Sequence, residues 1–240
     1  MFSERLLAIF EMMATRERSS DGHGLLCTVA AEITAVKSSG IALTNEMLMT
    51  RFCASNAMAR SLIDAEVTFG EGPGIRAVEN NDVVAVSDLL AVPAGEWMAY
   101  TPAALALGAR SVYALPVRIG VIRVGVLCLY HDEPLALSDA QSTDALIMAS
   151  VVGRGIIALQ AGANSHGLSE ELQNEAAFDF TVHQAAGMVA VQAAVPIASA
   201  LVALRMHAFA QSQSLATIAT RVVARQLRFD AGLQRWIESR

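Results

Sequence analysis

The stretch SVYALPVRIGVIRVGVLCLYH, residues 111–131, decides the fold. It holds two runs rich in Val, Leu, Ile and Tyr, residue types that pack well on a pleated surface. The pair Ile119–Gly120 separates the runs and suits a tight turn between antiparallel strands. The second run is mostly apolar on both of its alternating faces, as in a strand covered on both sides. The stretch therefore predicts a hairpin at the centre of an antiparallel sheet.

The sequence around this hairpin predicts further strands and helices. Two strands are expected at 38–45 (SSGIALTN) and 83–86 (VVAV), which are short runs of strand-forming residues. Two helices are expected at 25–36 and 101–109, where apolar residues recur at helical spacing. Strands and helices interleaved in this way predict a mixed α/β domain.

Helices are expected at both ends of this domain. Ser138 and Gln141 have the spacing of a capping box, so a long helix should begin there and run to about residue 160. Residues 1–24 should form an amphipathic helix that covers the core or a dimer seam. They contain no signal-peptide core. The apolar face of this helix would consist of Leu6, Leu7, Phe10 and Met13.

Residues 180–204 contain no Asp, Glu, Lys or Arg, although Asp179 and Arg205 flank them. A membrane span of this length would be strongly apolar, whereas this run is mostly small residues with several polar ones. Pro196 also interrupts the helical backbone. We therefore expect no membrane span, and two helices that meet near Val195–Pro196. A linker at 161–168 should precede them, and a further helix should follow Ser214.

Charge is distributed unevenly along the chain. The net charge is −6 and the pI is about 5.4, which does not indicate a nucleic-acid binder by bulk charge. Residues 205–240, however, hold six Arg and two acidic side chains, a net charge of +4. Arg221, Arg225 and Arg228 would share one helix face, either as a phosphate-binding surface or as an ordinary solvated face.

Other candidate chemistry is sparse. Three dispersed cysteines without a CxxC pair indicate neither a zinc site nor a disulfide scaffold, which suits a reducing cytoplasm. Of the three, Cys53 could be exposed and reactive. GEGPG at 70–74 could cradle a phosphate, but a turn with positive φ is favoured because Pro73 removes a donor. No metal site and no nucleophile–base pair is apparent, so we expect no enzyme; no cofactor is indicated.

Small residues line one side of the charge-free run. Ala186, Ala190 and Ala194 form a stripe, with Gly187 beside it. Such a stripe favours either close helix packing or a flat surface for an unstacked base. In the second case Gln184 and Arg205 would lie at its edge.

The motifs HQAAGMVAVQ, AxxxLRxxAFA and SLATIATRVVARQLRF together resemble an ANTAR domain. FGEGPGIRAV, VAVSDL, LGARSVYALPVRIG and GVLCLY resemble a GAF domain. The resemblance implies an α+β chain in which a GAF domain at 25–160 precedes an all-α three-helix ANTAR bundle at 169–240. It further implies a homodimeric, cytoplasmic regulator that binds tandem RNA stem-loops and prevents transcription termination. A small molecule at the GAF domain would control it.

The resemblance also implies site residues. Ala185, Gly187, Ala200, Leu204, Arg205 and Ala208 match the ANTAR pattern, whereas Ala186 stands where a basic residue is common. We expect RNA contacts from His183, Gln184, Ala186, Gly187, Arg205, Arg221, Arg225 and Arg228. A GAF ligand would meet Phe52, Trp97, Tyr100 and Tyr113.

Three other functions stay open. The chain could be a DNA-binding regulator with a helix-turn-helix, although 220–227 offers no turn glycine. It could be a signalling dimer whose helices bind a protein. It could also be a redox enzyme, which would need clustered, reactive cysteines. Salt-sensitive RNA binding would favour the RNA-binding regulator, and thiol-dependent turnover would favour the enzyme.

Overall fold

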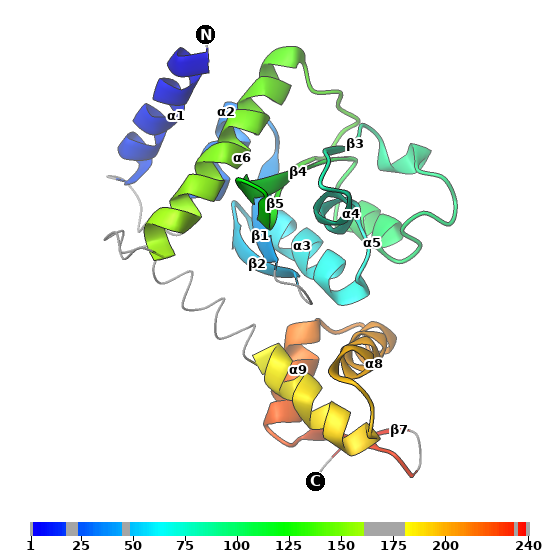
Figure 1. The fold of residues 1–240 in the computed structure, drawn as a ribbon. Helices are drawn as coiled ribbons and strands as arrows, with labels where there is room; N and C mark the ends of the chain where they lie inside the picture. Colours follow the sequence, from blue (N-terminus) through cyan, green and yellow to red (C-terminus); the bar gives the residue numbers. More distant parts are fainter. Residues whose placement is uncertain (1, 18–23, 45–48, 161–180, 233–234, 239–240) are drawn as a thin grey trace.

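The computed structural model describes residues 2–17, 24–44, 49–160, 181–232 and 235–238. We call residues 24–160 the sheet domain and residues 181–238 the helical domain. The sheet domain contains a five-stranded antiparallel sheet, and the helical domain lies at one end of it (Figure 1). The predicted linker at 161–168 and the start of the domain at 169 lie outside the described residues.

The sheet has the strand order β2-β1-β5-β4-β3. The predicted hairpin is β4 and β5, which pair from Ser111 opposite His131 to Ile119 opposite Ile122. Gly120 in the turn has φ 61°, a conformation that favours glycine. The four predicted strands are confirmed, and β2 was not foreseen. The bounds are Ser38–Thr44 (β1), Met49–Ala54 (β2), Val84–Val86 (β3), Ser111–Ile119 (β4) and Ile122–His131 (β5).

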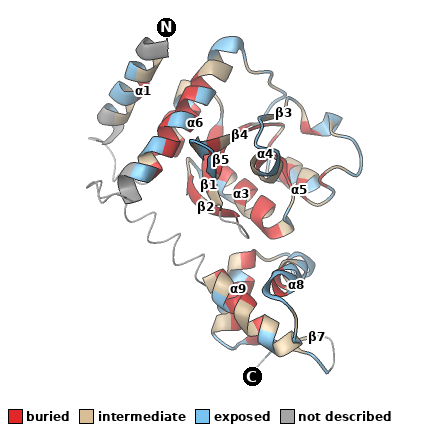
Figure 2. Cartoon of the chain, viewed as in Figure 1, coloured by how far each residue is buried: buried red, intermediate tan, exposed pale blue. Residues whose placement is uncertain are grey.

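Helices cover both faces of the sheet, so β4 and β5 are buried between two apolar layers (Figure 2). One layer consists of α1, α2 and α6, and the other consists of α3, α4 and α5. A short 3-10 helix, Leu89–Ala91, follows β3. The helix bounds are Phe2–Glu17 (α1), Leu25–Ile33 (α2), Ala57–Phe69 (α3), Pro73–Asn80 (α4), Tyr100–Ala106 (α5) and Asp139–Gln160 (α6).

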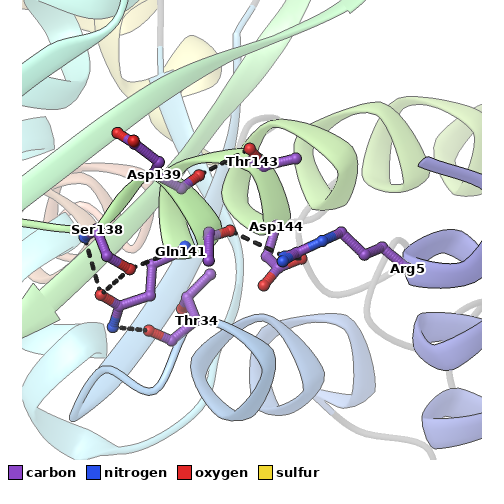
Figure 3. Close-up of polar contacts among 8 residues, drawn as sticks. Arg5, Thr34, Ser138, Asp139, Gln141, Thr143 and Asp144 are labelled. Carbon is purple, nitrogen blue, oxygen red and sulfur yellow. Dashed lines mark hydrogen bonds and ion pairs between the residues drawn. The ribbon is translucent and has the colours of Figure 1, made fainter. Parts of the chain in front are cut away.

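The capping box at the start of α6 is confirmed (Figure 3). The Ser138 amide donates to Gln141 Oε1 at 3.0 Å, and the Gln141 amide donates to Ser138 Oγ at 3.3 Å. The Gln141 side chain also donates to the carbonyl of Thr34 at 2.8 Å, which ties α6 to the end of α2. Further along α6, Gly153 lets the helix approach the Arg118 carbonyl of β4 closely. The cost of a glycine inside this helix is thus offset by packing.

The N-terminal helix is present, but its buried face differs from the prediction. Ile9 is fully buried in the core, whereas Leu7 and Phe10 are 60% and 45% exposed. An ion pair of 2.5 Å from Arg5 to Asp144 holds α1 against α6 (Figure 3).

The expectation of no disulfide is wrong. Cys27 of α2 and Cys53 of β2 form a disulfide, and both residues are buried. Cys53 is therefore not an exposed thiol. Cys128 is free and buried in β5. The dispersed positions in sequence hid the pairing, because β1 pairs with β2 and α2 packs on both strands.

The helical domain has three described helices: Thr181–Ala193, α8 (Ile197–Ala210) and α9 (Leu215–Val223). The predicted break at Val195–Pro196 is confirmed by a bend of 104° between the first two. Among the described residues no single helix has the length and mean hydropathy that a membrane span needs. The two helices on either side of the bend reach that length and hydropathy only when they are counted together. The domain is not all-α, because β6 (Leu227–Asp230) and β7 (Arg235–Glu238) form a C-terminal hairpin.

Candidate nucleic-acid interface

A pocket of about 600 Å³ opens on the helical domain between its first helix and the β6 strand. We call it the Gly187 pocket. Its lining combines small or apolar side chains with two arginines. The lining residues are Gly187, Met188, Val191, Gln192, Val222, Arg225, Leu227 and Arg228.

The first helix lines this pocket with Gly187, which has no side chain, and with Met188, Val191 and Gln192. Its opposite side packs into the domain through Val182, Ala185, Ala186 and Val189, which are all buried. At Gly187 a Cβ atom would meet no described atom within 4 Å, so the glycine adjoins open space. The small-residue stripe therefore serves two purposes: Ala186 packs in the core, and Gly187 leaves a flat surface.

The arginine pattern differs from the predicted helix face. α9 ends at Val223, and Arg225 adopts φ 59° in the turn before β6. The three arginines thus lie on a helix, a turn and a strand. Arg221 is half-buried, and it donates to Gln213 Oε1 at 3.2 Å and to Glu238 Oε1 at 2.5 Å. The side chains of Arg225 and Arg228 are exposed at the pocket, with Arg228 3.8 Å from Asp230.

The hairpin that carries Arg228 is fixed to the rest of the domain. The amide of Phe229 donates to Gln192 Oε1 at 2.9 Å, which joins β6 to the first helix. Trp236 of β7 stacks on His207 with ring centroids 4.7 Å apart and meets Phe229 edge-on at 5.5 Å. Burial, and then the charge of Arg221, lower the pKa of His207. The β6 wall of the Gly187 pocket is therefore held in place by packing against the first helix and α8.

The predicted RNA-contact residues fall into two groups. Gly187, Arg225 and Arg228 line one pocket, and Gln184 is exposed one turn before Gly187. His183 is half-buried on the same helix. The remaining predicted contacts are placed differently: Ala186 is buried in the core, Arg221 is held by Glu238, and Arg205 lies on another surface.

Arg205 lies where the two domains meet. There α8 and α9 pack against the C-terminal end of α3. Phe69 and Phe209 contact edge to face, with ring centroids 5.5 Å apart. The Leu215 amide donates to Thr68 Oγ1 at 3.3 Å, and this bond is buried. One continuous apolar cluster therefore includes residues of both domains.

The GEGPG segment holds a carboxylate of the chain itself. The amides of Gly74 and Ile75, at the start of α4, each donate to the fully buried Glu66 carboxylate at 3.2 Å. A Cβ at Gly74 would overlap that carboxylate, and Gly72 has φ 141°. Favourable charge at a helix N-terminus explains the arrangement. The prediction of a turn with positive φ is confirmed for Gly70 and Gly72.

Burial dominates the electrostatics around Glu66. It raises the pKa of Glu66 to about 7, although hydrogen bonds from Gly74 and Ile75 oppose the rise. Burial likewise raises the pKa of Tyr100, Cys128 and Tyr130, and the nearby Glu66 charge adds to each. The sheet domain thus contains a closed group of polar side chains against its α3–α5 face.

The four aromatic residues predicted to meet a ligand do not share a pocket. Trp97 and Tyr100 lie in the apolar layer of α3–α5, whereas Phe52 and Tyr113 lie in the layer on the other face of the sheet. All four are buried. The Tyr113 hydroxyl donates to the Leu135 carbonyl, which fixes it as a core residue. Sequence position alone could not show that the sheet separates these side chains.

No cluster of three or more metal-ligating side chains occurs within the described ranges. His183 and His207 lie on different helices, as expected.

No protein-family profile matches the chain, and no curated protein matches it. In fold the chain is similar to several solved structures. One is the GAF domain of a phosphoenolpyruvate-protein phosphotransferase from Coxiella burnetii, at 13% identity and a TM-score of 0.49, covering 66% of this chain and 96% of that one. Another is the GAF domain of a two-component sensor histidine kinase from Bacillus halodurans, at 10% identity and a TM-score of 0.42, covering 54% and 86%. A third is a free methionine-R-sulfoxide reductase from Neisseria meningitidis, at 19% identity and a TM-score of 0.47, covering 67% and 91%.

Proposed function

We propose that this chain is a signal-responsive regulator whose helical domain binds RNA stem-loops and prevents transcription termination. In this proposal the sheet domain is a GAF-type sensor, and the protein acts as a homodimer without catalytic activity. The residues assigned to RNA are Gln184, Gly187, Arg225 and Arg228.

The observation that carries the proposal is the juxtaposition of Gly187 with two exposed arginines. Sequence-specific proteins read RNA mainly at loops, where unstacked bases can lie on flat protein surfaces. The open backbone at Gly187 offers such a surface. Arg225 and Arg228 line the same pocket, and guanidinium groups both stack on bases and pair with phosphates.

Charge supports the same surface. Residues 205–240 carry a net charge of +4 in a chain whose total is −6. Arg221 is half-buried and paired with Glu238, whereas Arg225 and Arg228 are exposed at the pocket, where Arg228 also forms a long ion pair of 3.8 Å with Asp230. Few phosphate contacts imply moderate affinity with a shallow salt dependence.

A direct titration tests the proposal. The full chain is titrated with a tandem-hairpin RNA, a scrambled RNA and duplex DNA at two salt concentrations. We expect hairpin-selective binding that weakens with salt. Arg225→Gln and Arg228→Gln should each weaken binding and reduce the salt slope by about one. Arg118→Gln, an exposed arginine of β4, is the matched control and should change nothing.

The other outcomes separate the alternatives. Preference for duplex DNA would favour a DNA-binding regulator. Equal, weak binding to all three nucleic acids would refute RNA recognition and favour a protein partner for the helical domain.

A further inference from the structure

A second pocket, of about 470 Å³, lies between the two domains. We call it the interdomain pocket. The end of α3 and the loop before α5 form one side, and α8 forms the other. It does not overlap the Gly187 pocket, since the two share no lining residue. Its volume falls within the range of small-molecule sites, about 300–1,000 Å³.

The walls of the interdomain pocket are apolar and accessible. Met98, Met206 and Phe209 are 74%, 67% and 57% exposed, which is unusual for large apolar side chains. Val202, Met206 and Phe209 recur at intervals of four and three residues, so they share one face of α8. Two of the wall residues are methionines, whose flexible thioethers adapt to varied apolar ligands.

One charged group in this apolar setting, Arg205, has no counter-ion among the described residues. Arg205 Nε is inaccessible to solvent and has no hydrogen-bond partner in the described part of the chain. Arg205 is half-buried, and this burial lowers the pKa of its guanidinium. An unpaired, desolvated donor of this kind is costly until an acceptor satisfies it.

Nε itself is closed to a ligand, so an acceptor would reach Arg205 through the terminal nitrogens of its guanidinium. Its guanidinium lies over the C-terminal end of α3 at Gly70, which has no side chain. Glu71 is the acidic residue that lines the pocket, but Glu71 Oε1 accepts from the amides of Ala99 and Tyr100 at 2.6 and 3.1 Å. That carboxylate is thus directed to the start of α5, and no ion pair joins it to Arg205 within the described residues.

We propose that the interdomain pocket binds a small amphipathic carboxylate. The carboxylate of the ligand accepts hydrogen bonds from Arg205, and its apolar body lies against Met98, Met206 and Phe209. Such a ligand contacts both domains at once. This inference does not depend on RNA binding, because Arg205 is outside the Gly187 pocket.

Isothermal titration of the full chain with three probes of equal chain length tests the proposal. The probes are octanoate, 1-octanol and octylammonium, which share an apolar body and differ in head-group charge. We expect octanoate to bind about tenfold more tightly than octanol, because its carboxylate accepts a charge-assisted hydrogen bond from Arg205. Octylammonium should bind most weakly.

Three variants locate the site. Arg205→Gln should abolish the preference for octanoate over octanol, and Val202→Trp should fill the pocket and weaken both. Arg225→Gln is the matched control: it should leave octanoate binding unchanged while it weakens RNA binding. Equal binding of octanoate and octanol, no binding of octanoate, or unchanged octanoate affinity in Arg205→Gln would each overturn the proposal.

Discussion

Glu66→Gln should remove a pH dependence of stability that originates in one buried group. Glu66 is fully buried, and both of its carboxylate oxygens face amide donors at the start of α4. Burial raises its pKa from 4.5 to about 7. The folded protein therefore retains this proton at pH values where the unfolded chain has lost it.

The sign and size of the effect follow from proton linkage. Between pH 4.5 and about 7 the folded state binds more protons than the unfolded state, so the free energy of unfolding falls as pH rises. The contribution is fully present below pH 4.5 and is lost above pH 7. Each unit of pKa difference corresponds to about 1.4 kcal/mol. The buried carboxylate thus lowers stability by about 3 kcal/mol at pH 8 relative to pH 4.

Urea unfolding at pH values from 4.5 to 8 measures this effect, with circular dichroism and tryptophan fluorescence as probes. The quantity of interest is the difference in unfolding free energy between Glu66→Gln and the unmodified chain. It should shift in favour of the variant by about 3 kcal/mol as pH rises. Glu79→Gln removes an exposed carboxyl from α4, the helix whose amides Glu66 faces, and should show a flat difference. A flat difference for Glu66→Gln would refute the raised pKa of Glu66, because the folded and unfolded chains would then bind the same number of protons at this group.

Gly74→Ala should destabilise the chain by about 1–3 kcal/mol in thermal or urea unfolding, because the added methyl overlaps a buried carboxylate. Gly187→Ala adds the same methyl in open space within a helix and should instead stabilise by about 0.5–1 kcal/mol; a loss of stability would show that the space is filled. Reducing the Cys27–Cys53 disulfide, which joins residues 26 apart, should lower the unfolding free energy by about 3 kcal/mol; an unchanged unfolding curve in reductant, with thiol labelling as the check, would contradict this. Phe209→Ala should lose an aromatic contact of about 0.5–1.5 kcal/mol and increase proteolysis between the domains, whereas an unaltered digestion pattern would mean that this contact does not hold them together.

The elements that were predicted correctly are those that depend on local signals in the sequence. The hairpin β4–β5, the capping box of α6 and the break at Pro196 each depend on residues close in sequence. Strand propensity, cap chemistry and proline geometry act over such distances, so the sequence alone was sufficient.

The wrong predictions concern contacts between distant residues. The helix expected to carry three arginines ends at Val223, and residues 227–230 instead pair with residues 235–238 as antiparallel strands, with Phe229 against Trp236. The disulfide joins residues that only the pairing of β1 with β2 brings together. Arg205 was assigned to a nucleic-acid surface on its motif position; it lies against the C-terminal end of α3, outside the Gly187 pocket, and its contact with RNA stays a prediction. No local pattern encodes any of these contacts.

Helix α3 is the element through which the sheet domain contacts α8 and α9 of the helical domain. Glu66, at the centre of the polar group of the sheet domain, lies less than one turn from Thr68 and Phe69, which contact α9 and α8. A single α-helix of 13 residues is stiff over this distance. A tilt of α3 inside the sheet domain would therefore displace the surface against which α8 and α9 pack, and with it one wall of the interdomain pocket.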